Sequence, residues 1–235
     1  ALLKNTICLT KANRVFMSQH IGDLENLGTL RFFTETIEHL SRILEIKPEI
    51  VAFDLHPDYL SSHHGRELQN VTKVPVQHHH AHIVSCMAEH KLDGRVIGLS
   101  FDGTGLGTDG CIWGGEIMVA EPGHFERAAH LSYVPMPGGA AAIKEPWRMA
   151  ASYLMDAFGQ DFSELEIPAI KKIEPARLKV IAEMVAKGVN SPLTASLGRL
   201  VDAVAAIAGI RTQVSFAGQS AMELEMRAVD RPCGL

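Results

Sequence analysis

Residues 96–119 read VIGLSFDGTGLGTDGCIWGGEIMV. The run 96–102 is apolar and ends in an acidic residue, which is the pattern of a buried strand with its functional end at the carboxyl side. A glycine-rich segment, 102–110, follows, and residues 112–119 are apolar again. The stretch therefore predicts a strand, a glycine loop and a second strand. This order differs from the P-loop and from the dinucleotide fingerprint, in which the glycine loop opens a helix.

The predicted loop carries groups that suit a phosphate. Its glycines let backbone N–H groups turn toward an anion without obstruction by Cβ atoms. The Asp102 carboxylate would repel phosphate directly, so it is better placed to hold a hydrated Mg²⁺ that bridges phosphate oxygens. An ordinary glycine-rich hairpin turn is the alternative. The expected phosphate-site residues are Asp102, Gly103, Thr104, Gly105 and Gly107.

Strands and helices alternate on both sides of this stretch. Further strands are predicted at 4–9 and 14–18, as a hairpin-like start, and at 50–54 and 74–76. Helices are predicted at 29–44, from His78 onward, and at 146–158, 174–187 and 197–210, with Gly188 and Gly209 as C-caps. The alternation indicates an α/β fold of two lobes that meet near residue 95, with a ligand between them.

Five of the twelve histidines lie between His78 and His90. His78 and His82 are four residues apart, so on a helix they share one face and can direct two imidazoles at a single ion. Zinc and iron suit imidazole ligands. Two ligands do not complete a site, so at least one more must come from a distant part of the chain. The alternative is a helix start with solvated histidines.

Two other segments carry candidate polar groups. Lys144 and Arg148, at a helix start, could hold a phosphate-bearing substrate or a pyrophosphate leaving group, or else form a solvated first turn. Asp202 lies in an otherwise apolar helix, where a ribose diol would serve as its partner unless the side chain simply faces solvent. Gly218 and Glu223 belong to a loop-to-helix start that could complete a nucleoside pocket.

Composition narrows the class of protein. The chain has 235 residues, 46% of them hydrophobic and 21% charged, which predicts a globular domain with a real core. The formal net charge of −5 gives no electrostatic footprint for nucleic acid. No apolar run reaches the ~20 residues of a membrane span, and no signal-peptide layout is present, so we expect a cytoplasmic protein. The scattered cysteines, Cys8, Cys86, Cys111 and Cys233, predict neither a zinc ribbon nor a disulfide framework.

Five motifs, taken in order, resemble the HypF family of hydrogenase-maturation carbamoyltransferases. Their order and mutual spacing make the resemblance specific, and it spans nearly the whole chain. Antibiotic O-carbamoyltransferases are the nearest family that could be confused with it. The motifs are VQHHHAH (76–82), FDGTG (101–105), WGGE (113–116), EPWRMA (145–150) and GQSAMELE (218–225).

The resemblance implies a Kae1-like domain of the actin, sugar-kinase and Hsp70 superfamily, with two RNase H-like lobes closing over ATP. Residues 1–95 would form lobe I with the metal-binding histidines, and 96–235 an incomplete lobe II with the phosphate and ribose segments. In that family, carbamoyl phosphate and ATP give carbamoyl-adenylate. The carbamoyl group then passes to the C-terminal cysteine of the partner protein HypE, and its product is dehydrated to the cyanide ligands of the nickel-iron centre.

The resemblance also assigns residues. His78 and His82 match the family's metal ligands, and the segment beginning at Asp102 matches its second phosphate motif. Asp202 matches the ribose-binding acid. Lys4, Asn5 and Thr6 fall where the first phosphate hairpin would lie.

The chain departs from the family pattern at both ends. Full-length members begin with acylphosphatase-like, zinc-finger and YrdC-like segments, which are absent here, and the chain stops before the glycine-rich adenosine loop and the acidic third metal ligand. We therefore expect a fragment with an unpaired sheet edge, weak metal binding and poor stand-alone catalysis. The alternatives are an O-carbamoyl- or threonylcarbamoyl-transferase, or a non-catalytic actin-like nucleotide-binding module.

Overall fold

The computed structural model describes residues 3–228, which divide into two compact units. Residues up to His78 belong to the first unit and residues from His79 onward to the second. The lobe boundary near residue 95 stays a prediction, because compact contact units and ligand-binding lobes need not share a boundary. Each unit is described by itself.

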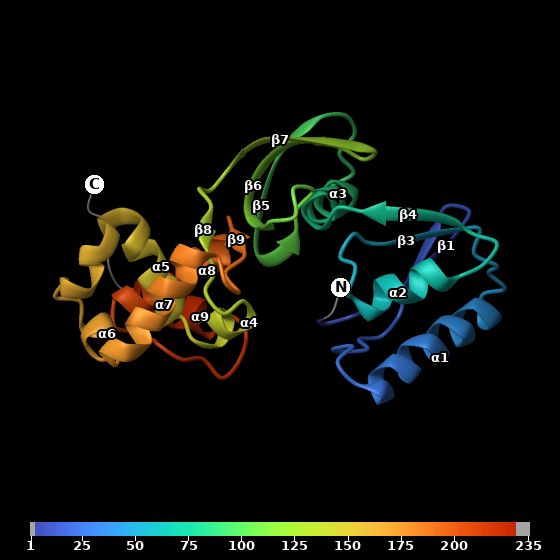
Figure 1. The fold of residues 1–235 in the computed structure, drawn as a ribbon. Helices are drawn as coiled ribbons and strands as arrows, with labels where there is room; N and C mark the ends of the chain where they lie inside the picture. The colour runs from blue at the N-terminus through green and yellow to red at the C-terminus, as the bar shows by residue number, and fades with distance from the viewer. Residues whose placement is uncertain (1–2, 229–235) are drawn as a thin grey trace. The chain divides into compact units, whose positions relative to one another are not determined.

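The first unit consists of two small sheets and two helices (Figure 1). Strands β1 and β2 form an antiparallel hairpin, and β3 and β4 pair in parallel, as the apolar runs at 50–54 and 74–76 indicate. The strands are β1 (Cys8–Lys11), β2 (Arg14–Met17), β3 (Ile50–Asp54) and β4 (Thr72–Val76). The helices are α1 (Leu27–Ile43) and α2 (Leu60–Glu67).

Helix α1 confirms the amphipathic helix predicted at 29–44. It begins two residues earlier because the Asn26 side chain accepts a hydrogen bond from the Thr29 N–H at 2.9 Å and so caps the first turn. Phe33 on its inner face packs with buried Ile7 and Leu24 in the core of this unit. Burial of this stripe holds the helix on the hairpin.

The predicted first strand, 4–9, is wrong at its start, since β1 begins only at Cys8. Lys4 has a φ of 53°, in the left-handed region, which breaks an extended strand. Asn5 makes an isolated bridge to Gly22, and its N–H donates to the Gly22 carbonyl. Lys4, Asn5 and Thr6 therefore precede the hairpin instead of forming it.

The second unit is a mixed sheet with helices. Within the described residues its strands run in the order β5-β6-β9-β8, with β7 paired to β6 (Figure 1). The strands are β5 (Val96–Leu106), β6 (Ile112–Glu121), β7 (His124–His130), β8 (Val134–Pro135) and β9 (Leu193–Thr194). The helices are α3 (His78–Glu89), α4 (Ala140–Lys144), α5 (Trp147–Phe158), the 3-10 helix η1 (Gly159–Glu164), α6 (Pro168–Lys171), α7 (Pro175–Lys187), α8 (Leu197–Ile207) and α9 (Gln219–Ala228).

Helices cover the sheet and form a second layer beside it. Ile83 and Met87 of α3 pack against Met118 of β6, which fixes α3 to one face of the sheet. Helices α5, α7 and α8 match the predicted ones, although α8 ends at Ile207 instead of residue 210. Gly188, with a φ of 64°, caps α7 in the left-handed conformation, as predicted.

The prediction that residues 96–102 form a fully buried strand is wrong. Strand β5 pairs antiparallel with β6, and its side chains alternate between two faces. Gly98 lies against the Ile83 side chain of α3, whereas Ile97 is 77% exposed and Phe101 55% exposed. The sequence does not show this alternation, because the exposed face carries apolar residues and the buried face carries small ones.

The predicted glycine loop is also displaced. Residues 102–106 belong to β5, and a register shift between Phe101 and Gly105 marks a β-bulge. The chain reverses only between Gly107 and Cys111, where the Gly107 N–H donates to the Cys111 carbonyl at 2.8 Å. Gly103 and Gly105 lie in β5 and not in the turn. The lack of a side chain at Gly103 instead lets α8 come close to the strand.

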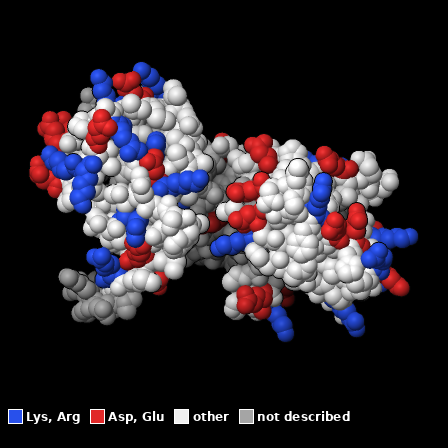
Figure 2. All heavy atoms as spheres, turned by 90° about the horizontal axis from the view of Figure 1, so that it is seen from below, with Lys and Arg blue, Asp and Glu red and all other residues white. Residues whose placement is uncertain are grey.

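Surface charge, helix hydropathy and the cysteines do not point to a particular site. Basic and acidic side chains are interspersed over the face in view in Figure 2. No helix in the described range, 3–228, combines the length and apolarity that crossing a bilayer requires. Cys8, Cys86 and Cys111 are free thiols, and Cys233 lies outside the described residues.

Candidate functional site

His78 and His82 stand one turn apart at the start of α3, directly after β4. The boundary between the units falls after His78, so the helix itself fixes His78 relative to His82. Asp102, on the bulge of β5, completes a group of three in which one ligand atom from each residue lies within 4.8 Å of the others. His82 Nε2 is 3.7 Å from Asp102 Oδ2.

This donor set fits a divalent transition metal. Two imidazoles and one carboxylate are the protein ligands of many catalytic zinc sites, which keep a fourth position open, and also of non-haem iron(II) sites. The expectation that the third ligand lies outside the chain stays a prediction, and Asp102 is a candidate for that ligand within the described residues because it lies beside the two histidines. The chemistry of the set does not choose between zinc and iron.

Asp54, at the carboxyl end of β3, orients the first histidine. His78 Nδ1 lies 2.7 Å from Asp54 Oδ2. Burial acts to raise the pKa of Asp54, but hydrogen bonds from His78 and from the His56 N–H, with the charge on His78, lower it below its ordinary value. An ionised Asp54 accepts the Nδ1 proton and leaves His78 Nε2 as the nitrogen that can bind a metal.

We predict that Asp54→Asn weakens zinc or iron(II) binding by about 10- to 100-fold, because it removes the carboxylate that sets the His78 tautomer while leaving all three ligands. Metal-competition titration with a chromophoric chelator measures the affinity. Asp58→Asn, an exposed aspartate four residues along the chain, serves as the control. Equal affinities of the Asp54 variant and the unaltered chain would contradict the orienting role.

The neighbouring histidines face the sheet. His79 is fully buried, and His80 Nε2 lies 2.8 Å from the Glu121 carbonyl on β6. Their rings therefore help to hold α3 on the sheet, while His82 is directed toward Asp102. This arrangement explains why only two histidines of the cluster belong to the candidate metal group.

Helix α8 packs its N-terminus against the bulge that carries Asp102. Ser196, the N-cap, places its Oγ 2.8 Å from the Asp102 carbonyl and 2.7 Å from the Gly103 carbonyl. A Cβ on Gly198 would lie 2.9 Å from Gly103 Cα, so α8 and β5 approach each other closely through these two glycines. The positive end of the helix dipole consequently faces the candidate phosphate segment.

A charged network that the sequence does not reveal fixes the β5–β6 turn. Arg127 Nε on β7 donates to Glu116 Oε2 at 2.5 Å, and buried Glu116 accepts the N–H of Gly114 at 3.0 Å. Asp109 in the turn accepts hydrogen bonds from the Tyr133 hydroxyl and from the indole of Trp113. Trp113 and Glu116 lie in the quoted WGGE motif, but no local pattern marks the other partners.

Two tyrosines, Tyr133 in this network and Tyr153 on α5, are expected to ionise late. Burial and a hydrogen bond to Asp109 raise the pKa of Tyr133 to about 12, and burial beside the Asp156 charge raises the pKa of Tyr153 to about 12. Folded-state pKa values above the unfolded value of ~10 give stability that is complete below pH ~10 and is lost as the pH rises toward 12. Tyrosinate absorbance during alkaline titration measures this, and Tyr133→Phe should remove one late-titrating group. Ionisation of all tyrosines near pH 10 would contradict it.

Lys144 and Arg148 lie in a separate cluster. Lys144 is exposed at the end of α4, and Arg148 Nε donates to Glu145 Oε2 at 2.5 Å. Glu145 also accepts from Arg177 at 2.7 Å. Burial acts to raise the pKa of Glu145, but these two arginines lower it. Arg148 is thus already paired with a carboxylate, and its role as an anion ligand stays a prediction.

The predicted nucleoside residues are also engaged within the fold. Asp202 is buried, and its Oδ2 lies 2.9 Å from Arg199 Nη2. Glu223 on α9 accepts hydrogen bonds from Arg211 and Gln219. Gly218, with a φ of 83°, makes the turn that starts α9. Helices α8 and α9 bring Asp202 and this turn into one region, and ribose binding there stays a prediction.

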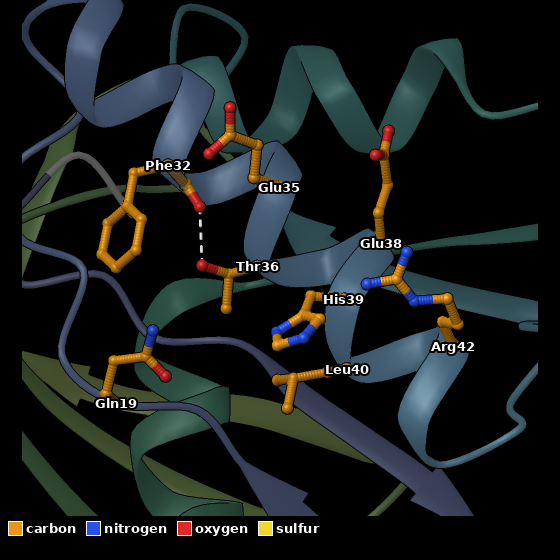
Figure 3. Close-up of a pocket in the computed structure, with 8 residues that line it drawn as sticks. All are labelled: Gln19, Phe32, Glu35, Thr36, Glu38, His39, Leu40 and Arg42. Carbon is orange, nitrogen blue, oxygen red and sulfur yellow. Dashed lines mark hydrogen bonds between the residues drawn. The ribbon is translucent and has the colours of Figure 1, made fainter.

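Two surface hollows lie away from these residues. One, of about 390 Å³, runs along α1, where Gln19 lies opposite residues from Phe32 to Arg42 (Figure 3). The other, of about 810 Å³, is apolar and is lined by α5, η1, α6 and α7. Neither is lined by a predicted site residue.

Two family models together match nearly the whole chain. Residues 1–89 match the HypF Kae1-like domain, and residues 98–233 match the second subdomain of the carbamoyltransferase Kae1-like domain. The chain belongs to the HypF family. The resemblance drawn from the five motifs is thereby confirmed, as is a Kae1-like HypF domain.

Individual HypF proteins are similar over the same span. Carbamoyltransferase HypF2 of Cupriavidus necator is 46% identical over 225 residues, which are 94% of this chain and 27% of that protein. The probable carbamoyltransferase HypF of Methanocaldococcus jannaschii is 32% identical over 96% of this chain and 30% of its own length. The chain therefore spans less than a third of either relative.

Solved HypF structures share the fold. A full-length HypF in a phosphate- and nucleotide-bound form superposes with a TM-score of 0.90 at 44% identity, covering 95% of this chain and 35% of that one. The HypF of T. kodakarensis superposes with a TM-score of 0.86 at 34% identity, covering all of this chain and 32% of that one. The family assignment thus holds at the level of both sequence and fold.

Proposed function

We propose that this chain is a metal- and ATP-dependent carbamoyltransferase domain of hydrogenase maturation. It would move the carbamoyl group of carbamoyl-adenylate, made from carbamoyl phosphate and ATP, to the C-terminal cysteine of HypE. The observation that carries the proposal is the grouping of His78, His82 and Asp102 within 4.8 Å in a chain of the HypF family. Its relatives are named carbamoyltransferases, and one was solved with phosphate and nucleotide bound.

The residues divide the work as follows. His78, His82 and Asp102 would hold zinc or iron(II), which when bound supplies Lewis-acid stabilisation of negative charge that develops on the transferring group. Asp54 keeps the His78 ring in the orientation and tautomer that a ligand needs.

We propose that the fold is that of two RNase H-like lobes of the actin, sugar-kinase and Hsp70 superfamily.

Phosphate binding is assigned to the bulge of β5. Thr104 would supply the hydroxyl donor beside Asp102, since the Gly103 N–H already donates to Asp102 Oδ1 at 2.6 Å. Mg²⁺ carried by the nucleotide would offset the repulsion between phosphate and the Asp102 carboxylate. Lys4, Asn5 and Thr6 remain the proposed first phosphate segment, and Asp202 the proposed ribose ligand.

The transfer step balances without a further reactant. The cysteine sulfur attacks the carbamoyl carbon, a C–S bond forms, and the bond from that carbon to the phosphate oxygen breaks. The electron pair of the broken bond leaves with AMP, and the thiol proton passes to solvent. Stabilising the charge that builds on the carbamoyl oxygen is the contribution that the metal group would make.

The test uses the 235-residue polypeptide with zinc or iron(II), synthetic carbamoyl-adenylate and a peptide that ends in cysteine. Mass spectrometry should find one carbamoyl group on the peptide thiol, formed at the low rate expected of this chain by itself, and no transfer after chelation of the metal. A matched peptide ending in serine is the control for acceptor chemistry. Transfer to serine alone would favour an O-carbamoyltransferase, and nucleotide binding with no transfer to either peptide would favour a non-catalytic actin-like module.

A further inference from the structure

A buried arginine lies where α5, α8 and α9 meet β5. Arg199 is 7% exposed, and its Nη2 lies 2.9 Å from Asp202 Oδ2. Its Nε and Nη1 are buried and have no hydrogen-bond partner among the described residues. The hydroxyl of Tyr153 on α5 is also buried and has no hydrogen-bond partner within residues 3–228. It lies near enough to Arg199 for the arginine charge to act against the rise in the pKa of Tyr153. Polar N–H and O–H groups thus gather here without acceptors.

This arrangement is costly unless something completes it. A buried donor that lacks an acceptor destabilises the fold, and more so when it is charged. Asp202 offsets the charge of Arg199 but engages only one of its nitrogens. Burial lowers the pKa of Arg199, and the nearby carboxylates of Asp202 and Asp102 counteract that shift, so the cation is stabilised by acids on two sides.

The guanidinium faces the Asp102 bulge. Arg199 is in the first turn of α8, and its Nη2 is the nearest heavy atom, at 3.9 Å, to the position that a Cβ on Gly103 would occupy. Ser196 holds the same helix end on the carbonyls of Asp102 and Gly103. The positive end of α8 and the buried cation therefore converge on the strand segment that carries Asp102.

We propose that Arg199 is an anion-binding residue of this site and donates its unmatched N–H groups to a phosphate oxygen of the ligand at Asp102 and Gly103. The inference rests on the proposed function, which assigns phosphate to this segment. A phosphate group fits better than a neutral ligand, because two positive groups would attract it: the cation that Asp102 would hold and the guanidinium of Arg199. The contact would supply acceptors to donors that the fold leaves without them.

Pyrophosphate with Mg²⁺ is the probe, because it carries phosphate without a ribose that Asp202 could bind. Calorimetric titration of the full chain should show that Arg199→Lys weakens pyrophosphate binding by about 10- to 100-fold. Arg177→Lys, at an ion pair with Glu145, is the matched control and should bind as the unaltered chain does.

A merely structural role is separated by a double variant. Replacing Arg199 and Asp202 together by leucine removes both buried charges, so the melting temperature should recover relative to Arg199→Leu alone. Pyrophosphate binding should nevertheless stay weak if Arg199 contacts the anion. Recovery of both the melting temperature and the binding would overturn the proposal, and show Arg199 as a partner of Asp202 only.

The outcomes also distinguish this inference from the proposed function. Unaltered affinity in Arg199→Lys, with normal pyrophosphate and ATP binding by the unaltered chain, would overturn the role of Arg199 alone. If the unaltered chain binds neither pyrophosphate nor ATP, both the role of Arg199 and the proposed function are overturned. Carbamoyl transfer is not a readout, so a chain that binds phosphate through Arg199 but does not transfer would contradict only the proposed function.

Discussion

Replacing His78 and His82 together by alanine should remove zinc or iron(II) binding and lower metal affinity well beyond the ~100-fold that loss of an orienting residue costs. Only the Asp102 carboxylate of the group remains in this variant, and a single carboxylate does not retain a borderline metal at micromolar concentration. Elemental analysis after equilibration with each metal, together with competition titration, measures the loss. Transfer to the cysteine peptide should disappear in parallel.

Two comparisons keep this result interpretable. His39→Ala changes a histidine on α1, outside the metal group, and should leave metal content unchanged. Circular dichroism of the double variant checks that α3 still folds, since His78 also contacts Asp54. A folded double variant that retains one metal per chain would show that the metal, and the proposed chemistry with it, belongs elsewhere.

Asp102 should prove to be the third ligand. Asp102→Asn keeps the size of the side chain and weakens its metal-binding oxygen, so metal affinity should fall while both histidines stay in place. Binding of metal by this variant as tightly as by the unaltered chain would favour the expectation that the third ligand lies outside the chain. The measurement is the competition titration used for the histidine variants.

The sequence predicts the parts of this site that depend on local pattern. Two histidines spaced by four residues after an apolar run indicate one helix face, and α3 begins at His78. The sequence does not predict that Asp102 lies beside His82, because this distance depends on how α3 packs across β5, which no local periodicity encodes. Tertiary packing, not secondary structure, therefore places Asp102 beside the two histidines.

Glycines mislead for a related reason. Four glycines in 103–110 predict a loop, but strand pairing with β6 extends β5 through Leu106. Gly107 is needed because a Cβ there would lie 2.0 Å from the Trp113 indole nitrogen, and not because the chain turns at that residue. The partners Arg127 and Tyr133 come together only through the register of β7 and the segment after it. Sequence alone does not set that register.

Gly114→Ala should be the most destabilising single glycine substitution near the site, by about 4 kcal/mol in the free energy of unfolding. Gly114 has a φ of 152°, which strains an L residue by about 1–3 kcal/mol. The added Cβ would also lie 2.5 Å from the Asp102 carbonyl oxygen, a backbone atom that cannot rotate away, and such overpacking costs about 1–3 kcal/mol. Urea unfolding measures the change.

Two other glycines separate these causes. Gly110→Ala tests strain alone, since its φ is 80° and nothing lies within 4 Å of the added Cβ, and it should cost about 1–2 kcal/mol. Gly123→Ala meets neither obstacle and should stay within about 0.5 kcal/mol. Because the Gly114 clash pushes on Asp102 itself, Gly114→Ala should also weaken metal binding, whereas Gly110→Ala should not. Equal destabilisation by the Gly114 and Gly110 variants would mean that β6 does not hold the Asp102 bulge in place.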